Sequence, residues 1–134
     1  MAEPILKVDR CCTWFDVTRG LFSKKQIVKA VNGVSLEVFP GETLGLVGES
    51  GCGKSTLGRT IVKVYTPVSG HIYYKGQDIT CLTGAKEKEF RKQVQMIFQD
   101  PYASLNPRMT VGEIIREPMD IHSLYTAQER EARV

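Results

Sequence analysis

One stretch of the sequence, residues 48–55, has the residue types and spacing of a phosphate-binding loop. It reads Gly48-Glu49-Ser50-Gly51-Cys52-Gly53-Lys54-Ser55 and matches the pattern G-x-x-x-x-G-K-[ST]. Glycines let a backbone wrap tightly, so that successive N–H groups point at phosphate oxygens. Lys54 supplies a point charge for β- and γ-phosphates, and Ser55 supplies a hydroxyl for Mg²⁺. The pattern therefore predicts phosphate binding at this loop.

The flanking sequence has the elements that such a loop needs. Thr43–Val47 is a short, nearly all-apolar run, which is typical of a strand buried on both faces of a parallel sheet. After the loop, Lys54–Tyr65 carries apolar residues at helical spacing, and Thr66-Pro67 is expected to stop that helix. The positive end of the helix dipole would then face the bound phosphate.

The remaining N-terminal segments predict an antiparallel β region. Ile5–Val17 and Ile27–Phe39 have the composition or alternation of strands, with a solvated hairpin loop over Thr18–Gln26 between them. Pro40-Gly41 is a turn signal. His71–Tyr74, a turn over Lys75–Asp78, and Ile79 indicate a second hairpin.

The C-terminal half predicts one more buried strand and several helices. Val94–Phe98 is a second apolar run, preceded by a charged stretch that suits an exposed helix, with Glu87 and Arg91 four residues apart. Two capping boxes follow, Thr110 with Glu113 and Thr126 with Glu129. The first is expected to open a short helix that Pro118 ends, and the second a helix that runs to Val134.

Composition excludes several classes of protein. The chain has 134 residues, of which 42% are hydrophobic and 25% charged, as in ordinary soluble globular proteins. A net charge of +3 is too small to imply nucleic-acid binding through bulk electrostatics. The apolar runs are only a few residues long, whereas a membrane span needs about 20. The four cysteines form no C-x-x-C pair, which favours reduced thiols in a cytoplasmic protein.

The segment Gln95–Val111 narrows the class of phosphate-binding protein. In it an apolar strand ends in Gln99 and is followed by a proline-rich loop and a capped helix. Ligand groups in open α/β sheets usually lie at such strand ends. The Asn-Lys-x-Asp signal of guanine-nucleotide proteins is absent from the sequence.

Residues 28–36, 41–56 and 95–111 together closely resemble the ATP-binding subunits of ABC transporters, most strongly those of oligopeptide and dipeptide importers. The resemblance covers nearly all of the chain. It implies an α/β fold of the P-loop NTPase class, namely the N-terminal part of an ABC-type nucleotide-binding domain. That part would contain an antiparallel β subdomain and the start of the helical subdomain.

The resemblance also assigns site residues. Gln99 is similar to the Q-loop glutamine, which contacts Mg²⁺ and the attacking water, and Phe15 to the aromatic residue that stacks on adenine, with Trp14 as its neighbour. A core role for Phe15 is the alternative. The catalytic residues would be Lys54 and Gln99, and the Mg²⁺ ligands Ser55 and Gln99. The ATP-binding residues would be Phe15, Gly48, Glu49, Ser50, Gly51, Cys52, Gly53, Lys54, Ser55 and Thr56.

Three family motifs are not found in the sequence: the L-S-G-G-Q signature, an apolar strand ending in Asp-Glu, and a downstream switch histidine, since His122 lies too early. We therefore expect residues 1–134 to be a partial domain, with the P-loop at 48–55, the Q-loop region at 99–109 and the missing motifs beyond Val134. Such a chain should bind ATP without hydrolysing it. It should also expose apolar edges at Thr43–Val47 and Val94–Phe98.

The resemblance implies that the full-length protein couples ATP binding and hydrolysis to the import of oligopeptides, dipeptides or similar small solutes. Its partners would be transmembrane permease subunits and a second ATP-binding subunit, identical or different, at the cytoplasmic face of the membrane. Two alternatives stay open at this point. One is a soluble ABC ATPase of DNA repair or translation, and the other is a non-catalytic nucleotide-binding fragment.

Overall fold

The structure is a computed structural model that describes residues 3–18, 24–100, 102 and 104–134. The chain divides into two units, Met1–Glu87 and Lys88–Val134.

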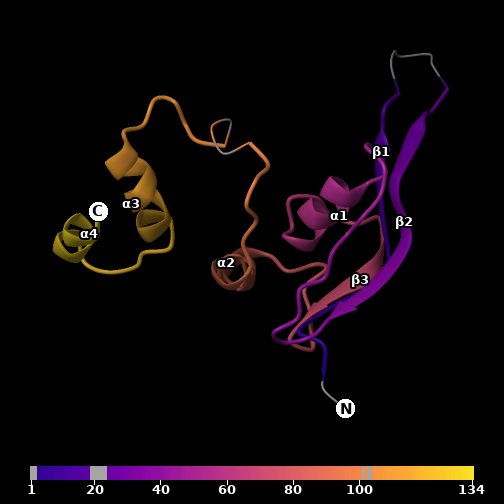
Figure 1. Ribbon diagram of the computed structural model, residues 1–134, viewed down its shortest axis with the longest axis horizontal. Helices are drawn as coiled ribbons and strands as arrows, with labels where there is room; N and C mark the ends of the chain where they lie inside the picture. The colour runs from indigo at the N-terminus through magenta and orange to yellow at the C-terminus, as the bar shows by residue number, and fades with distance from the viewer. Residues whose placement is uncertain (1–2, 19–23, 101, 103) are drawn as a thin grey trace. The chain divides into compact units, whose positions relative to one another are not determined.

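The first unit is built on a four-stranded antiparallel sheet with strand order β2-β1-β3-β4 (Figure 1). The strands are β1 (Leu6–Asp16), β2 (Ile27–Val38), β3 (Ser69–Tyr74) and β4 (Gln77–Asp78). The predicted strands of the first hairpin and the predicted strand His71–Tyr74 of the second are therefore confirmed. The predicted turn over Lys75–Asp78 and strand at Ile79 are wrong in position, because the turn takes only Lys75 and Gly76, so that Gln77 and Asp78 already pair with Tyr74 and Tyr73. The β1–β2 hairpin is closed by a hydrogen bond of 2.9 Å from Val17 N to Gln26 O, and residues 19–23 of its predicted loop lie outside the described residues.

One face of this sheet carries the core and the other carries charges. Side chains from β1, β2, β3 and helix α1 are buried, together with Ile79 after β4; they are Val8, Cys11, Cys12, Thr13, Val31, Leu57, Thr60, Ile72 and Ile79. Lys7 and Glu37 form an exposed ion pair of 2.7 Å across β1 and β2. An exposed ion pair beside buried apolar residues is expected for a sheet covered on one face, although β1 buries three consecutive residues, Cys11, Cys12 and Thr13.

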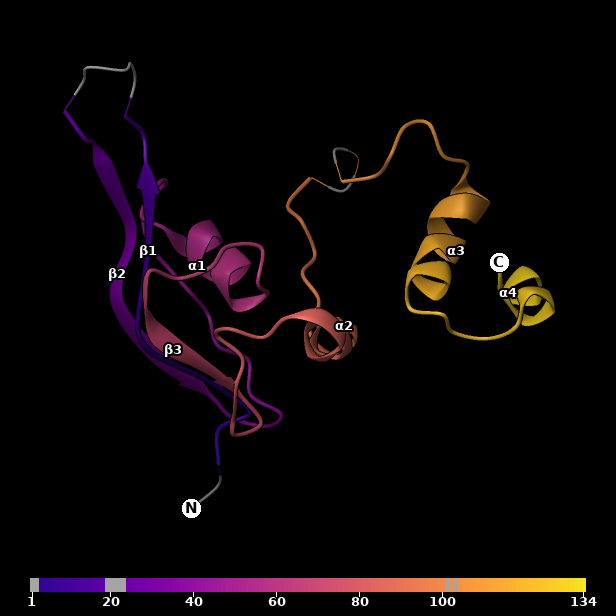
Figure 2. The same cartoon turned by 180° about the vertical axis from the view of Figure 1, so that it is seen from behind.

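Helix α1 (Lys54–Ile61) packs against β1 and β2, on one face of the sheet in both views (Figures 1 and 2). The Oγ1 atoms of Thr13 and Thr60 are 3.0 Å apart in a buried hydrogen bond that joins strand and helix. The helix ends four residues before the predicted end at Tyr65. Lys63 has a left-handed backbone with φ 61°, and the N–H of Val64 bonds Arg59 O at 2.8 Å, which closes the helix.

Two predictions of buried strands are wrong. Thr43–Val47 and Val94–Phe98 have no regular secondary structure, and Val47 and Ile97 are 97% and 95% exposed. A strand needs a neighbour for its backbone hydrogen bonds, and neither segment pairs with the sheet of the described residues. The expectation that these segments expose apolar side chains is confirmed for Leu44, Leu46, Val47, Ile97 and Phe98.

Helix α2 (Gly84–Gln93) crosses the boundary between the two units. It is the predicted charged helix, and Phe90 is its buried residue.

The second unit contains α3 (Val111–Ile121) and α4 (Ala127–Arg133), each opened by its predicted capping box. The N–H of Glu113 donates to Thr110 Oγ1 at 3.3 Å, and the N–H of Thr110 donates to the Glu113 carboxylate at 2.7 Å. The prediction that Pro118 ends α3 is wrong, because the helix continues to Ile121. Proline removes one donor from the helix, but its φ is helical and its carbonyl still accepts the N–H of His122 at 3.1 Å.

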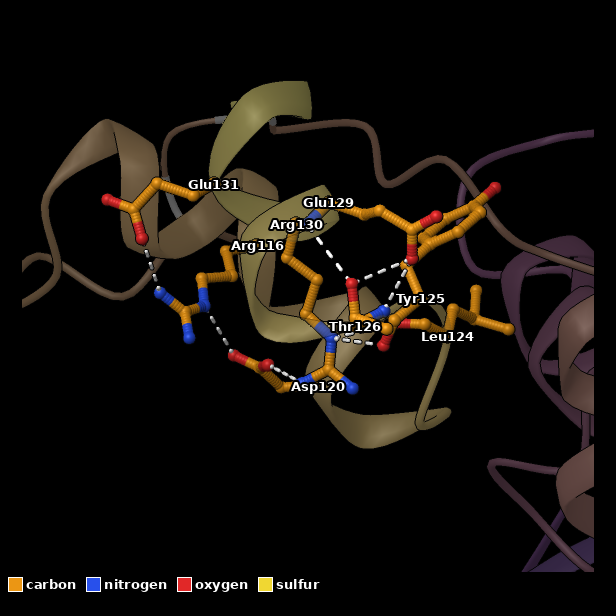
Figure 3. A network of polar contacts seen from close by, with 8 residues as sticks. All are labelled: Arg116, Asp120, Leu124, Tyr125, Thr126, Glu129, Arg130 and Glu131. Carbon is orange, nitrogen blue, oxygen red and sulfur yellow. Dashed lines mark hydrogen bonds and ion pairs between the residues drawn. The ribbon is translucent and has the colours of Figure 1, made fainter.

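Charged side chains join α4 to the end of α3 (Figure 3). Arg130 Nε donates to the carbonyl oxygens of Leu124 at 2.7 Å and Tyr125 at 3.2 Å, and its guanidinium pairs with Asp120. Arg116 Nε also pairs with Asp120, at 3.2 Å. These contacts satisfy carbonyl groups just beyond the C-terminus of α3.

Among the residues that the structure describes, none of the helices has both the length and the apolar character needed to span a bilayer.

Candidate nucleotide-binding site

The phosphate loop owes its shape to glycines with left-handed backbone conformations. Gly51 has φ 82° and Gly53 has φ 98°. A Cβ on Gly53 would lie 2.1 Å from the carbonyl oxygen of Ala30 on β2, so this position admits no side chain. Gly53 is also the N-cap of α1. The loop is therefore pressed against the sheet at the residue where the helix begins.

The sheet is irregular at the point of this contact. Thr13 pairs with Val31 but Trp14 pairs with Lys29, so the register shifts by one residue and Ala30 is the extra residue of a β-bulge. A bulge redirects the backbone locally. Here the backbone carbonyl of the extra residue faces Gly53. The sequence gives no signal for this bulge, because no glycine or proline marks it.

The ammonium group of Lys54 lies over the loop. Its Nζ donates to the carbonyl oxygens of Gly48 and Glu49, each at 2.7 Å, and to Cys52 Sγ at 3.4 Å. A Cβ on Gly48 would lie 2.7 Å from Cys52 Sγ and 3.9 Å from Lys54 Nζ. The first glycine of the motif thus leaves room for the thiol and the ammonium group in the fold of the loop.

The N-terminus of α1 is left open. Gly53 makes no side-chain hydrogen bond to cap it, and the first turn contains no acidic residue. The first intrahelical bond runs from Leu57 N to Gly53 O at 2.8 Å, so the N–H groups of residues 54–56 have no partner in the helix. Ser55 and Lys54 lie in this first turn. An uncapped N-terminus beside a lysine fits an anion such as a phosphate.

The predicted adenine-stacking residue lies at the end of β1. Phe15 is half-buried, and its ring meets that of Tyr65 edge-on, with centroids 5.1 Å apart and an interplanar angle of 79°. Its neighbour Trp14 lies under Lys29, whose Nζ is 4.7 Å from the indole centroid. The indole Nε1 of Trp14 is buried without a hydrogen-bond partner.

Gln99 lies in the second unit, in a segment of irregular backbone. It is exposed, and the following turns are closed by side chains: Tyr102 N donates to Asp100 Oδ1 at 3.0 Å, and Arg108 N donates to Asn106 Oδ1 at 3.1 Å. Phe15 and residues 48–56 all belong to the first unit. The roles of these residues in catalysis and ligand binding stay predictions.

The described residues contain no group of three or more His, Cys, Asp or Glu side chains suited to hold a metal ion. A magnesium ion at this loop would instead rely on the Ser55 hydroxyl and on phosphate oxygens, which is a usual arrangement at P-loops. The open helix end and the hydroxyl in its first turn fit that arrangement.

A glycine loop between a sheet and an uncapped helix, with a lysine over it, defines a P-loop nucleotide-binding protein. The sequence profile of the ABC transporter family matches residues 31–134, and the chain belongs to that family.

Two curated relatives and one solved structure illustrate the similarity. The chain is 52% identical, over 98% of its length, to the oligopeptide transport ATP-binding protein AppF of Bacillus subtilis. It is 44% identical, also over 98%, to the dipeptide transport ATP-binding protein DppF of Haemophilus influenzae. It spans 41% and 40% of those relatives.

The solved structure is a dimeric ATP-binding cassette, MJ0796, in a post-hydrolysis state bound to ADP and Pi. It superposes with a TM-score of 0.75 at 24% identity, over 96% of this chain and 53% of that one. This likeness shows the fold, and the predicted P-loop NTPase class of the ABC type is confirmed.

Proposed function

We propose that this chain is the N-terminal part of an ATP-binding subunit that powers an ABC importer of oligopeptides, dipeptides or similar small solutes. The observation that carries the proposal is the uncapped N-terminus of α1. It contacts the sheet at Gly53, and the Lys54 ammonium group lies over the loop that precedes it. The names of the curated relatives support peptides as the solute. Because these names are those of transport proteins, they favour import over a soluble ABC ATPase of DNA repair or translation.

In this proposal each residue has a defined physical task. The N–H groups at the start of α1 bind phosphate oxygens, and Lys54 exchanges its two loop carbonyls for the β- and γ-phosphates of ATP. The Ser55 hydroxyl is a ligand of Mg²⁺, which neutralises the charge between those phosphates when bound. Phe15 stacks on adenine. Gln99 contacts Mg²⁺ and orients the attacking water, as the family resemblance implies.

The proposed partners follow from the same resemblance. A second ATP-binding subunit would close the site, and permease subunits would receive the conformational change at the cytoplasmic face of the membrane. The relatives are more than twice the length of the chain. We accordingly propose that the signature, the Asp-Glu strand and the switch histidine belong to sequence beyond Val134.

The first test measures nucleotide binding. Lys54→Ala should abolish binding of a fluorescent ATP analogue in the presence of Mg²⁺, whereas Lys86→Ala, a matched loss of charge at an exposed position on α2, should leave it unchanged. Equal binding by both variants would contradict the proposal.

The second test measures hydrolysis. Residues 1–134 alone should release no more phosphate from ATP than the Lys54→Ala variant does, because the carboxylate that polarises water is absent from them. Steady turnover that is lost in Lys54→Ala would show that this part of the proposal is wrong.

A further inference from the structure

The rings of Phe15 and Tyr65 are in edge-on contact. The family resemblance assigns a role to Phe15 but none to Tyr65. Phe15 is the second-last residue of β1, and Tyr65 follows the end of α1. The ring centroids are 5.1 Å apart at 79°, which is a favourable geometry for an aromatic pair. Both side chains are half-buried, so the pair lies at the surface and not in the core.

Tyr65 is held in place by its backbone. After α1, the N–H groups of Val64 and Tyr65 both donate to Arg59 O, at 2.8 and 3.3 Å. Lys63, which makes the left-handed turn there, is anchored through Nζ to the carbonyl oxygens of Ile79 at 3.0 Å and Thr80 at 2.9 Å. The turn that presents Tyr65 is therefore tied both to the helix and to the segment after β4.

Phe15 has a fixed backbone as well, since it pairs with Val28 on β2. Its ring, however, can still rotate about its side-chain bonds, because pairing constrains only the backbone. The neighbouring contact between Thr13 and Thr60 sets the spacing of β1 and α1, and the Tyr65 ring then limits the orientation of the Phe15 ring. The Tyr65 ring thus restricts the ring of the residue that is predicted to stack on the base.

We propose that Tyr65 is a positioning residue for the nucleobase. It holds the Phe15 ring in the orientation that stacks on adenine, and it acts through Phe15 without being a catalytic residue. This inference rests on the function proposed above for Phe15. It adds a residue that neither the phosphate-loop motif nor the Q-loop segment contains.

The experiment compares two probes, ATP and inorganic tripolyphosphate, each with Mg²⁺, by calorimetric titration of the intact ATP-binding subunit. Both probes use the phosphate loop, but only ATP has a base. Phe15→Ala should weaken ATP binding about 5- to 150-fold, the range of base–aromatic stacking, without affecting tripolyphosphate. Tyr65→Ala should weaken ATP binding about 2- to 10-fold, the worth of an aromatic pair, again without affecting tripolyphosphate.

Two further variants separate positioning from a general structural role. Tyr65→Phe keeps the aromatic ring and should bind ATP like the unmodified protein. In a Phe15→Ala background, Tyr65→Ala should cause no further loss, because there is no ring left to position. Unchanged tripolyphosphate binding shows in every variant that the phosphate loop is still folded.

The outcomes distinguish the two proposals. If Phe15→Ala weakens ATP binding and Tyr65→Ala does not, the inference about Tyr65 is wrong and the role of Phe15 stands. An equal loss of ATP and tripolyphosphate binding in Tyr65→Ala would likewise overturn it, since that result indicates a damaged fold. If Phe15→Ala itself leaves ATP binding unchanged, the stacking role of Phe15 fails and the role of Tyr65 fails with it.

Discussion

Helix α1 and the pair α3 and α4 begin in opposite ways. At the start of α3 and of α4, a threonine hydroxyl accepts a hydrogen bond from a glutamate backbone N–H. The carboxylate of the same glutamate accepts a hydrogen bond from the threonine N–H. In α1 the first residue is preceded by Gly53, which offers no side chain. A capped N-terminus has fewer N–H groups left for an anion than an open one. The proposed phosphate site is therefore the N-terminus of α1, which the sequence marks by the absence of a cap.

The same helices also differ in what stabilises them. Helix α1 buries Leu57 and Thr60, whereas α3 and α4 bury none of their residues. The latter two rely on capping boxes and on exposed ion pairs such as Arg116 with Asp120 at 3.2 Å. Helix α1, whose N-terminus is uncapped, is instead stabilised by packing on the sheet.

The largest loss of stability should come from a substitution that disrupts the packing of Gly53 on the sheet at the start of α1. In Gly53→Ala the new Cβ meets the Ala30 carbonyl and the residue must also keep φ 98°, so the free energy of unfolding should fall by about 3 kcal/mol or more. Nucleotide binding should be lost with it. Urea unfolding and ATP titration measure both effects.

Gly51→Ala is the matched control for this change. Gly51 also has a left-handed backbone, φ 82°, but open space around its Cβ position, so only the strain of about 1–2 kcal/mol should appear. If the two variants were equally stable, the contact between Gly53 and the sheet would be irrelevant to α1.

The next largest effect is expected on ATP hydrolysis, from a substitution in the second unit. In the assembled transporter, Gln99→Ala should leave ATP binding nearly intact but lower solute-stimulated hydrolysis by about 10- to 100-fold, the cost of misplacing one reacting group. The reason is that Gln99 is proposed to orient water and does not belong to the phosphate loop. Loss of ATP binding in Gln99→Ala would instead indicate a structural role. Gln95→Ala, an exposed glutamine in the same segment, is the control.

Local signals in the sequence were sufficient to predict much of the secondary structure of this molecule. The β1–β2 hairpin, the glycine loop at the start of α1 and the capping boxes at Thr110 and Thr126 each involve residues close in the sequence, and each was predictable. Composition and spacing describe such features directly, because propensities, turns and caps act over a few residues.

The features that the sequence did not predict depend on residues far apart in the chain. Apolar runs at Thr43–Val47 and Val94–Phe98 look like buried strands, but strand formation needs a pairing partner. The bulge at Ala30 and the Phe15–Tyr65 contact arise from how strand and helix pack. Pro118 is a local exception: it lies inside α3 because a helix loses only one donor at a proline and can continue.

A third prediction concerns the rate at which Cys52, in the phosphate loop, reacts with a thiol reagent. Cys52 is exposed, so a maleimide should label it quickly, and Mg-ATP at about ten times its Kd should slow that labelling about tenfold, because only nucleotide-free protein reacts. Mass-spectrometric mapping of labelled cysteines over time measures the rates in the intact subunit. Labelling of Cys52 that is indifferent to ATP would contradict the placement of the phosphates.

The other cysteines are internal controls for this measurement. Cys81 is exposed and lies outside the loop, so its labelling should not respond to ATP. Cys11 is buried, and burial raises the pKa of its thiol, so it should react slowly with or without nucleotide.

The smallest effect should come from the capped helices, as a response to acid. Hydrogen bonds from the Thr110 backbone and side chain lower the pKa of Glu113 below its usual 4.5, and the same bonds from Thr126 lower the pKa of Glu129. A carboxyl with a lowered pKa in the folded state adds stability above about pH 4.5, and that stability is lost as the pH falls through the lowered value. Backbone amide exchange in α3 and α4 should therefore speed up, relative to α1, between about pH 5 and 3, since α1 has no acidic residue in its first turn.

Glu113→Gln keeps a hydrogen-bonding side chain but cannot titrate, so it should remove this pH dependence from α3 and leave that of α4 in place. If α3 in Glu113→Gln responded to acid like the unmodified helix, its capping box would not be the source of the response, and the contrast between capped and open helices would have to rest on packing alone.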